Sequence, residues 1–166
     1  MKITWLGHSS FRIDIAGQVP LVDPWLAGNP MLPADQHDAA VAGATHILLT
    51  HGHGDHTSEV DAIAKDTGAP VVGIPELCAI FSAHETVEFN KGGTVMLGDV
   101  AVTMVNAVHS SSVGTDHGPM YAGAEAGFMI SHGGRTIYFS GDTDVTADMG
   151  VMQALHAPEI GLLCCG

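Results

Sequence analysis

The chain has 166 residues, a length that suits one domain built around a single hydrophobic core. Its hydrophobic residues, 46% of the total, fall in short stretches well below the roughly 20 that cross a bilayer, so we expect no membrane association. Five Lys and Arg against eighteen Asp and Glu give a formal net charge of −13, which repels phosphate backbones and argues against nucleic acid as a partner.

The first part of the chain is rich in short β-type runs. Strands are predicted at Ile3–Leu6, Phe11–Ile15 and Pro20–Val22, and a loop containing Pro, Gly and Asn follows. The N-terminus reads as a strand and lacks the apolar h-region of a signal peptide, so we expect a cytoplasmic protein. A buried strand at Thr45–Thr50, a helix over Thr57–Thr67 capped by Thr57 or Ser58, and a strand at Pro70–Ile74 then form a βαβ unit.

The second part of the chain alternates strand-like runs with turn residues. Further strands are predicted at Thr86–Phe89, Thr94–Leu97, Val100–Val105, Ala126–Ser131, Thr136–Ser140 and Ile160–Cys165, with a helix near Ala147–Leu155. The Gly-rich segment Gly114–Gly127 is expected to be a mobile loop. This order predicts an α/β (or α+β) fold of two sheets with helices outside them, in a single domain over residues 1–166.

The segment Leu49-Thr50-His51-Gly52-His53-Gly54-Asp55-His56 lies between a buried strand and a helix. Three His and one Asp within six residues have no packing rationale, because each would be costly to bury without a partner. Imidazole and carboxylate are ligands that Zn²⁺ prefers, and the two glycines allow tight turns that bring alternate side chains together. We expect His51 and His53 to reach one ion and Asp55 and His56 to reach a second.

Two more candidate ligands follow strands. His109 comes after a predicted strand and before two serines, and Asp142 ends an apolar strand beside a glycine, where a core residue should not be charged. A carboxylate can bridge two cations with its two oxygens, which is the role we favour for Asp142. At other strand ends, Asp23 is expected to orient a ligand His. His8 is left open between substrate contact, support of a ligand and a structural role.

Other reactive residue types carry less weight. Ser110, Ser111 and Ser112 lack a GxSxG elbow, so a serine-hydrolase mechanism is disfavoured. Three cysteines, with two of them adjacent, do not resemble a disulfide framework. The remaining histidines have no partners at a recognisable spacing and are interpreted as surface or structural residues: His37, His46, His84, His117, His132 and His156.

The chain resembles the metallo-β-lactamase superfamily, whose hallmark is HxHxDH after a β-strand. The match is extended by TWLGHSSF at 4–11, DPWLAGNP at 23–30, HSS at 109–111 and YFSGDTDV at 138–145, which point to a branch of small metal-dependent hydrolases related to sugar-lactone lactonases. The resemblance implies an αββα sandwich and two metal sites. One would be held by His51, His53 and His109, the other by Asp55 and His56, with Asp142 bridging.

The resemblance also implies a reaction. We expect a hydrolase that uses metal-activated water on a small-molecule ester, lactone, amide or phosphoester, with Asp55 or Asp142 as the catalytic carboxylate. Zinc is favoured as the metal, with manganese, nickel or iron as alternatives. A non-catalytic or weakly active metal-binding domain and a di-iron redox protein stay open as alternatives.

The end of the chain differs from the pattern of this family. Members continue with a helix, a strand and a last His that completes the second metal site, whereas no His follows His156 here. We therefore expect the second site to be incomplete and to bind its ion more weakly than the first. We also expect the uncovered strand at 160–165 to favour homo-oligomers.

Overall fold

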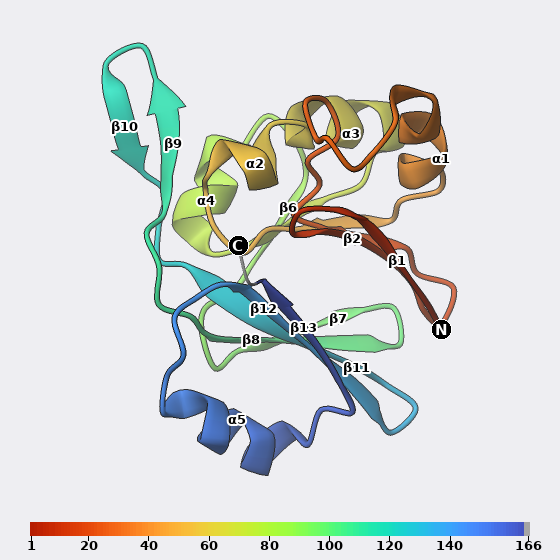
Figure 1. Cartoon of the computed structure of the whole chain (residues 1–166), viewed down its shortest axis with the longest axis vertical. Coiled ribbons are helices and arrows are strands. Elements are labelled where there is room, and N and C mark those ends of the chain that lie inside the picture. Colours follow the sequence, from red (N-terminus) through yellow and green to blue (C-terminus); the bar gives the residue numbers. More distant parts are fainter. Residues whose placement is uncertain (165–166) are drawn as a thin grey trace.

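Two β-sheets face one another in the computed structural model, which describes residues 1–164, and helices cover their outer faces (Figure 1). One outer layer contains a 3₁₀ turn and four short helices: Ala34–Gln36, then α1 (His37–Val41), α2 (Gly54–Thr57), α3 (Val60–Thr67) and α4 (Pro75–Ile80). The opposite layer is α5 (Asp148–His156). Within residues 1–164, no helix is both long enough and apolar enough to cross a bilayer.

The first sheet has six strands that follow one another in chain order: β1 (Lys2–Gly7), β2 (Ser10–Asp14), β3 (Pro20–Val22), β4 (His46–Leu48), β5 (Val71–Gly73) and β6 (Thr86–Glu88). β1, β2 and β3 are antiparallel neighbours, whereas β3 to β6 run parallel. Parallel neighbours need long crossovers, which the helices supply. The predicted βαβ unit is present as β4, α2, α3 and β5.

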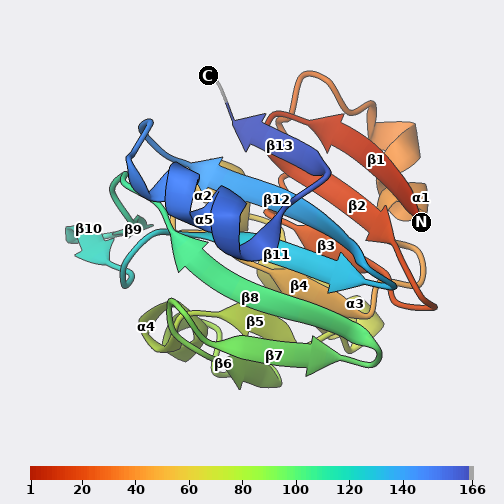
Figure 2. The ribbon, with the colours of Figure 1, turned by 90° about the horizontal axis from the view of Figure 1, so that it is seen from below.

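The second sheet has five strands in the order β13 (Ile160–Cys164), β12 (Arg135–Asp142), β11 (Ala126–His132), β8 (Val100–Asn106) and β7 (Thr94–Leu97). β7, β8, β11 and β12 are antiparallel neighbours, and β13 joins β12 in parallel after the chain has passed through α5. Figure 2 shows α5 lying over this sheet. Both sheets are mixed, so the expected αββα sandwich is confirmed. Cys165 lies outside the described residues.

The main core fills the space between the two sheets. Phe11 of β2 meets Phe139 of β12 edge to face, with ring centroids 5.7 Å apart, and Phe128 of β11 is fully buried beside them. Burying one such side chain stabilises a fold by about 1.5–3 kcal/mol. A smaller cluster under α5 contains Val105, Met129, Tyr138 and Met152. The second sheet is therefore covered on both faces, which holds its strand ends in place.

The region around the predicted helix Thr57–Thr67 differs from expectation. It forms two helices, α2 and α3, and neither Thr57 nor Ser58 caps α3, whose first flanking residue is Glu59. The Thr57 hydroxyl instead donates to the carbonyl of His53 at 3.0 Å, so it closes α2 rather than opening α3. The buried face of α3 is formed by Val60, Ile63 and Ala64.

The segment Gly114–Gly127, predicted as a mobile loop, contains regular structure. Most of it belongs to an antiparallel hairpin, β9 (Ser112–Thr115) and β10 (Gly118–Tyr121), which projects from the body of the molecule (Figure 1). The Thr115 hydroxyl closes the turn, because it donates to the Gly118 carbonyl at 2.6 Å and accepts from the His117 amide. The prediction was based on the glycines of this segment and did not consider that a threonine hydroxyl can stabilise a turn.

Five strand ends meet at one end of the sandwich. β1, β3 and β4 run in the same direction in the first sheet, and β8 and β12 run in the same direction in the second. The residues at or just after their carboxyl ends are His8, Asp23, His51, His109 and Asp142. Loops after parallel strands emerge at the same edge, so the topology itself gathers these polar side chains.

Candidate metal centre

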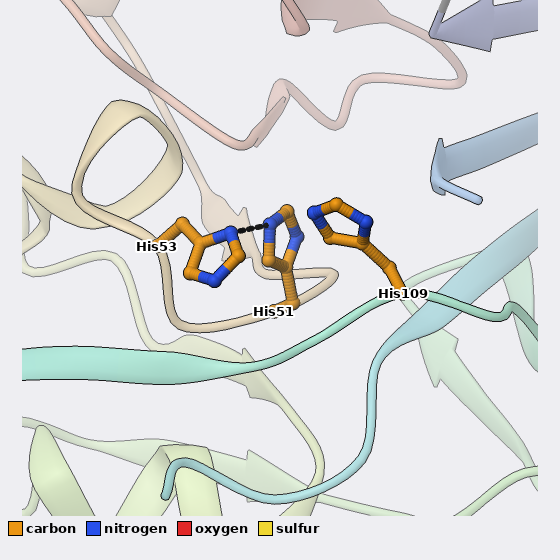
Figure 3. Close-up of side chains that lie close together, drawn as sticks. All are labelled: His51, His53 and His109. Atoms are coloured by element: carbon orange, nitrogen blue, oxygen red, sulfur yellow. Dashed lines mark hydrogen bonds between the residues drawn. The ribbon is translucent and has the colours of Figure 1, made fainter. Parts of the chain in front are cut away.

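Three histidines form the first cluster of ligand atoms. His51 and His53 come from the segment between β4 and α2, and His109 reaches them from the segment after β8 (Figure 3). One ring nitrogen from each lies within 4.8 Å of the others, and His51 Nε2 is 3.0 Å from His53 Nδ1. Burial lowers the pKa of His51 to about 4, which keeps this imidazole neutral, the form that binds metal.

The close approach of these loops explains one of the two glycines in the HGHGDH segment. A Cβ on Gly52 would lie 2.5 Å from the Cβ of Ala122, just after β10. Neither Gly52 nor Gly54 has a positive φ, and a Cβ on Gly54 would meet only open space. Tight turns therefore do not explain the glycines of this segment. Gly52 is needed because a side chain would not fit there, rather than for its backbone angles.

His56 is the best-anchored residue of the second group. It is fully buried, and its Nδ1 lies 2.9 Å from an oxygen of Asp23, a carboxylate that is also fully buried. Asp23 accepts two further hydrogen bonds, from the Thr50 amide at 2.8 Å and from the Thr50 hydroxyl at 2.6 Å. Asp23 thus holds the ring of His56 in place and leaves Nε2 facing the other ligands, as expected for a carboxylate that orients a ligand.

The other nitrogen of His56 provides a test of whether a cation fits. Nε2 is buried and has no hydrogen-bond partner, although an oxygen of Asp142 lies 3.5 Å away. Burial acts against protonation of His56, but the carboxylates of Asp23 and Asp142 outweigh it and raise the pKa to about 10. The same negative potential favours a metal cation beside Nε2. The residues present therefore fit a metal ion.

Asp142 lies between the two groups. Its Oδ2 is 3.5 Å from His56 Nε2 and 3.8 Å from His109 Nε2, and its Oδ1 accepts a hydrogen bond from the Ser9 hydroxyl at 3.3 Å. The contact with His56, together with the nearby histidines, lowers the pKa of Asp142, so that this carboxyl is ionised. An ionised carboxylate that faces one histidine from each group has the position that a bridging ligand needs.

Asp55 lies at the solvent side of the second group, the one that contains His56. Its Oδ2 is 3.0 Å from Nε2 of His8, and one ligand atom from each of His8, Asp55 and His56 lies within 4.8 Å of the others. The structure therefore brings together all six predicted metal-site residues, in two groups with Asp142 between them. Asp23 contacts His56 as the sequence led us to expect. The structure also adds His8, whose role the sequence left open, and Ser9, for which the sequence gave no signal.

The remaining candidates lie outside the ligand groups. Ser111 is buried, and its hydroxyl accepts the Gly52 amide at 3.2 Å, a structural role. Ser110 contacts His53 Nε2 at 3.3 Å at the rim. Glu125, which the sequence did not mark, accepts the backbone amide of His109 at 3.1 Å and so ties that loop to the body. Cys78 is buried and Cys164 is half-buried, both as free thiols.

A cavity of about 710 Å³ opens beside the ligands. His8, His109 and Asp142 form its polar side, and Trp5, Phe11 and Val108 form an apolar side. Pockets of this size, apolar with a few convergent polar groups, are typical of sites for small molecules.

Comparison with known proteins agrees with this geometry. A family model for the beta-lactamase superfamily domain matches residues 20–163. A UPF0173 metal-dependent hydrolase of Dinoroseobacter shibae is 70% identical, and the match covers 100% of this chain and 74% of that relative. A UPF0173 metal-dependent hydrolase of Paracoccus denitrificans is 57% identical with the same coverage.

Solved structures show the same fold. Igni18, a metallo hydrolase from Ignicoccus hospitalis, has a TM-score of 0.81 and 26% identity, covering 97% of this chain and 69% of that one. CmlA, a diiron beta-hydroxylase from Streptomyces venezuelae, has a TM-score of 0.68 and 20% identity, covering 92% of this chain and 32% of that one, a likeness of fold alone. The chain belongs to the metallo-β-lactamase superfamily, within the family of the UPF0173 metal-dependent hydrolases.

Proposed function

We propose that the chain is a hydrolase that acts on a small molecule through a centre of two divalent cations. His51, His53 and His109 would hold one cation, Asp55 and His56 the other, and Asp142 would lie between them. One observation carries the proposal. Asp142 faces His56 and His109 at 3.5 and 3.8 Å, so a single carboxylate meets both groups beside a buried nitrogen that has no hydrogen-bond partner.

Different residues of this chain would have different roles in the proposed reaction. Bound divalent cations lower the pKa of water toward about 7 and polarise a carbonyl or phosphoryl oxygen. Asp23 orients His56, and Ser9 orients Asp142 through its Oδ1. The Asp55 side chain is 43% exposed, and a carboxylate in contact with solvent can accept a proton and pass it on. Asp142 is the second carboxylate that could take this role.

The cavity and the charge of the chain narrow the substrate class. The apolar side formed by Trp5, Phe11 and Val108 suits a small organic group next to the scissile bond. A net charge of −13 disfavours polyanions such as nucleic acids. An ester, lactone, amide or phosphoester of a small cytoplasmic molecule therefore agrees best with the site.

Metal content provides the first test. The purified chain should contain zinc, manganese, nickel or iron by elemental analysis, and the double variant His51→Ala/His53→Ala should lose most of it. His84→Ala is a matched control, since His84 pairs with Asp61 at the surface. Equal metal content in the wild type and the double variant would overturn the proposed centre.

Activity provides the second test. The metal-loaded chain should hydrolyse at least one member of a panel of esters, lactones, amides and phosphodiesters, and a chelator should abolish the reaction. Metal binding without hydrolysis of any panel member would favour the alternative of a non-catalytic metal-binding domain. Iron as the bound metal, together with reversible redox activity, would favour the di-iron alternative.

A further inference from the structure

We propose that His8 is a protein ligand of the second cation, together with Asp55 and His56. The inference rests on the metal centre proposed above. It changes the expectation from the sequence, in which that site had only Asp55, His56 and the shared Asp142. His8 comes from the turn between β1 and β2, far from the HGHGDH segment in the chain.

The geometry of the three side chains is the first argument. His8 Nε2 lies 3.0 Å from Asp55 Oδ2, and ligand atoms of His8, Asp55 and His56 are all within 4.8 Å of one another. Two imidazoles and a carboxylate at this separation form a common ligand set for Zn²⁺ and related ions. The rings of His8 and His56 are 5.3 Å apart and nearly perpendicular, so they approach the same space from different directions.

The buried nitrogen of His56 is the second, independent argument. His56 Nδ1 is used by Asp23, which leaves Nε2 as the only ring nitrogen free to bind a cation. A fully buried ring nitrogen without a hydrogen bond is costly unless a ligand completes it. The other buried combination near it, Asp23 with His51 and His56, is less suitable, because Asp23 already accepts three hydrogen bonds.

The backbone around His8 is held in an unusual conformation. His8 has φ +48°, a left-handed angle that few non-glycine residues adopt, with Asn, Asp and His the most frequent among them. A Cβ on the preceding Gly7 would lie 2.6 Å from Oδ1 of Asn29, and the indole of Trp5 donates to the His8 carbonyl at 2.8 Å. Strain of this kind persists where the surrounding structure enforces it, and it clusters at functional sites. Here it turns the imidazole toward Asp55.

A simple surface ion pair is the competing explanation, and the chain contains one for comparison. His84 Nε2 lies 2.9 Å from Asp61 Oδ1, nearly the same separation as in the pair of His8 with Asp55. No third ligand atom joins His84 and Asp61 among the metal-type groups of the described residues, whereas His56 joins His8 and Asp55. His84 is therefore a matched control for a histidine that only pairs with an acid.

Metal titration of the stripped chain tests the proposal. The wild type, His8→Asn, His8→Gly, His51→Ala and His84→Asn are titrated with Zn²⁺ by calorimetry and with Co²⁺ by visible absorption. Asn and Gly both tolerate the left-handed angle at position 8, so circular dichroism should show a native fold in each. We expect two equivalents in the wild type and in His84→Asn. In both His8 variants the second equivalent should bind at least about tenfold more weakly, with the first unchanged.

The outcomes separate this inference from the proposed function. Two equivalents at wild-type affinity in both His8 variants would overturn the role of His8 while leaving the metal centre intact. The role of His8 would also be overturned if the wild type bound only one cation, the His8 variants still bound it, and His51→Ala did not. A wild type that binds no cation at all would overturn both proposals together.

Discussion

The two halves of the candidate centre are held in different ways. On the side of the first sheet, His51 and His56 are fully buried, and a closed network of Asp23 and Thr50 fixes His56. On the side of the second sheet, the His109 side chain is 37% exposed and that of Asp142 is 25% exposed. His109 is tied to the body through its backbone amide and Glu125.

This difference predicts which substitutions will affect folding and which will affect metal binding and the reaction. A buried carboxylate that accepts three hydrogen bonds, as Asp23 does, holds its partners rigidly, and leaving one of them unpaired is costly. Side chains at the rim of a cavity contribute little to folding but meet the substrate. We therefore expect loss of Asp23, which fixes His56, to act mainly on the fold, and substitutions of His109 and Asp142 to act mainly on metal binding and rate.

The largest effect on the fold should come from Asp23→Ala. The change removes the acceptor for His56 Nδ1 and for both Thr50 donors, all of them buried. The free energy of unfolding of the metal-free chain should fall by about 3–5 kcal/mol, as for other broken buried pairs. Urea denaturation measures it. Asp23→Asn should lose less, since Asn tolerates the φ of +47° and can still accept hydrogen bonds. If the free energy of unfolding of Asp23→Ala fell by less than about 1 kcal/mol, the Asp23 network would not stabilise the fold as proposed.

The largest effect on rate should come from Asp142→Ala. The carboxylate faces both histidine groups, so its removal should lower the hydrolysis rate at least about a hundredfold, comparable to the loss of one preorganised electrostatic contact. Its effect on urea denaturation of the metal-free chain should be much smaller than that of Asp23→Ala. The rate is measured on the best substrate of the panel. Wild-type turnover in Asp142→Ala would show that the bridging assignment is wrong.

A smaller effect is expected for Ser111→Ala. The Ser111 hydroxyl accepts the Gly52 amide at 3.2 Å, so its loss should lower the free energy of unfolding by about 1 kcal/mol. The rate should change less than about tenfold, because Ser111 has no nucleophilic role in the proposed mechanism. An inactive Ser111→Ala beside an active Asp142→Ala would instead indicate a serine mechanism.

The smallest effect on the fold should come from His109→Ala. In the presence of a chelator, the free energy of unfolding should stay within about 0.5 kcal/mol of the wild type, as at other exposed positions. With saturating metal, the wild type should gain more stability than the variant, because a cation stabilises the state that binds it. Thermal unfolding with and without Zn²⁺ measures both quantities. Equal stabilisation by metal in the two proteins would remove His109 from the first site.

Local pattern was enough to predict much of this molecule. HGHGDH places four ligand-type side chains within six residues directly after a buried strand, so neighbours in the chain are neighbours in space. Alternating and apolar runs predicted most strands of both sheets, because burial follows the pleat of each strand. Two features were missed for local reasons: the hydroxyls of Thr57 and Thr115 close turns that the glycine and capping patterns did not indicate.

The positions of distant residues were decided only by the tertiary structure. His8 and Asp23 were visible in the sequence as polar strand ends, but nothing local showed that one would face Asp55 and the other His56. That depends on the order of β1, β3 and β4 in one sheet and on how the second sheet packs against it. The same packing sets Asp142 between His56 and His109. Strand periodicity is a property of a few neighbouring residues, whereas sheet order and register arise from contacts among the whole core.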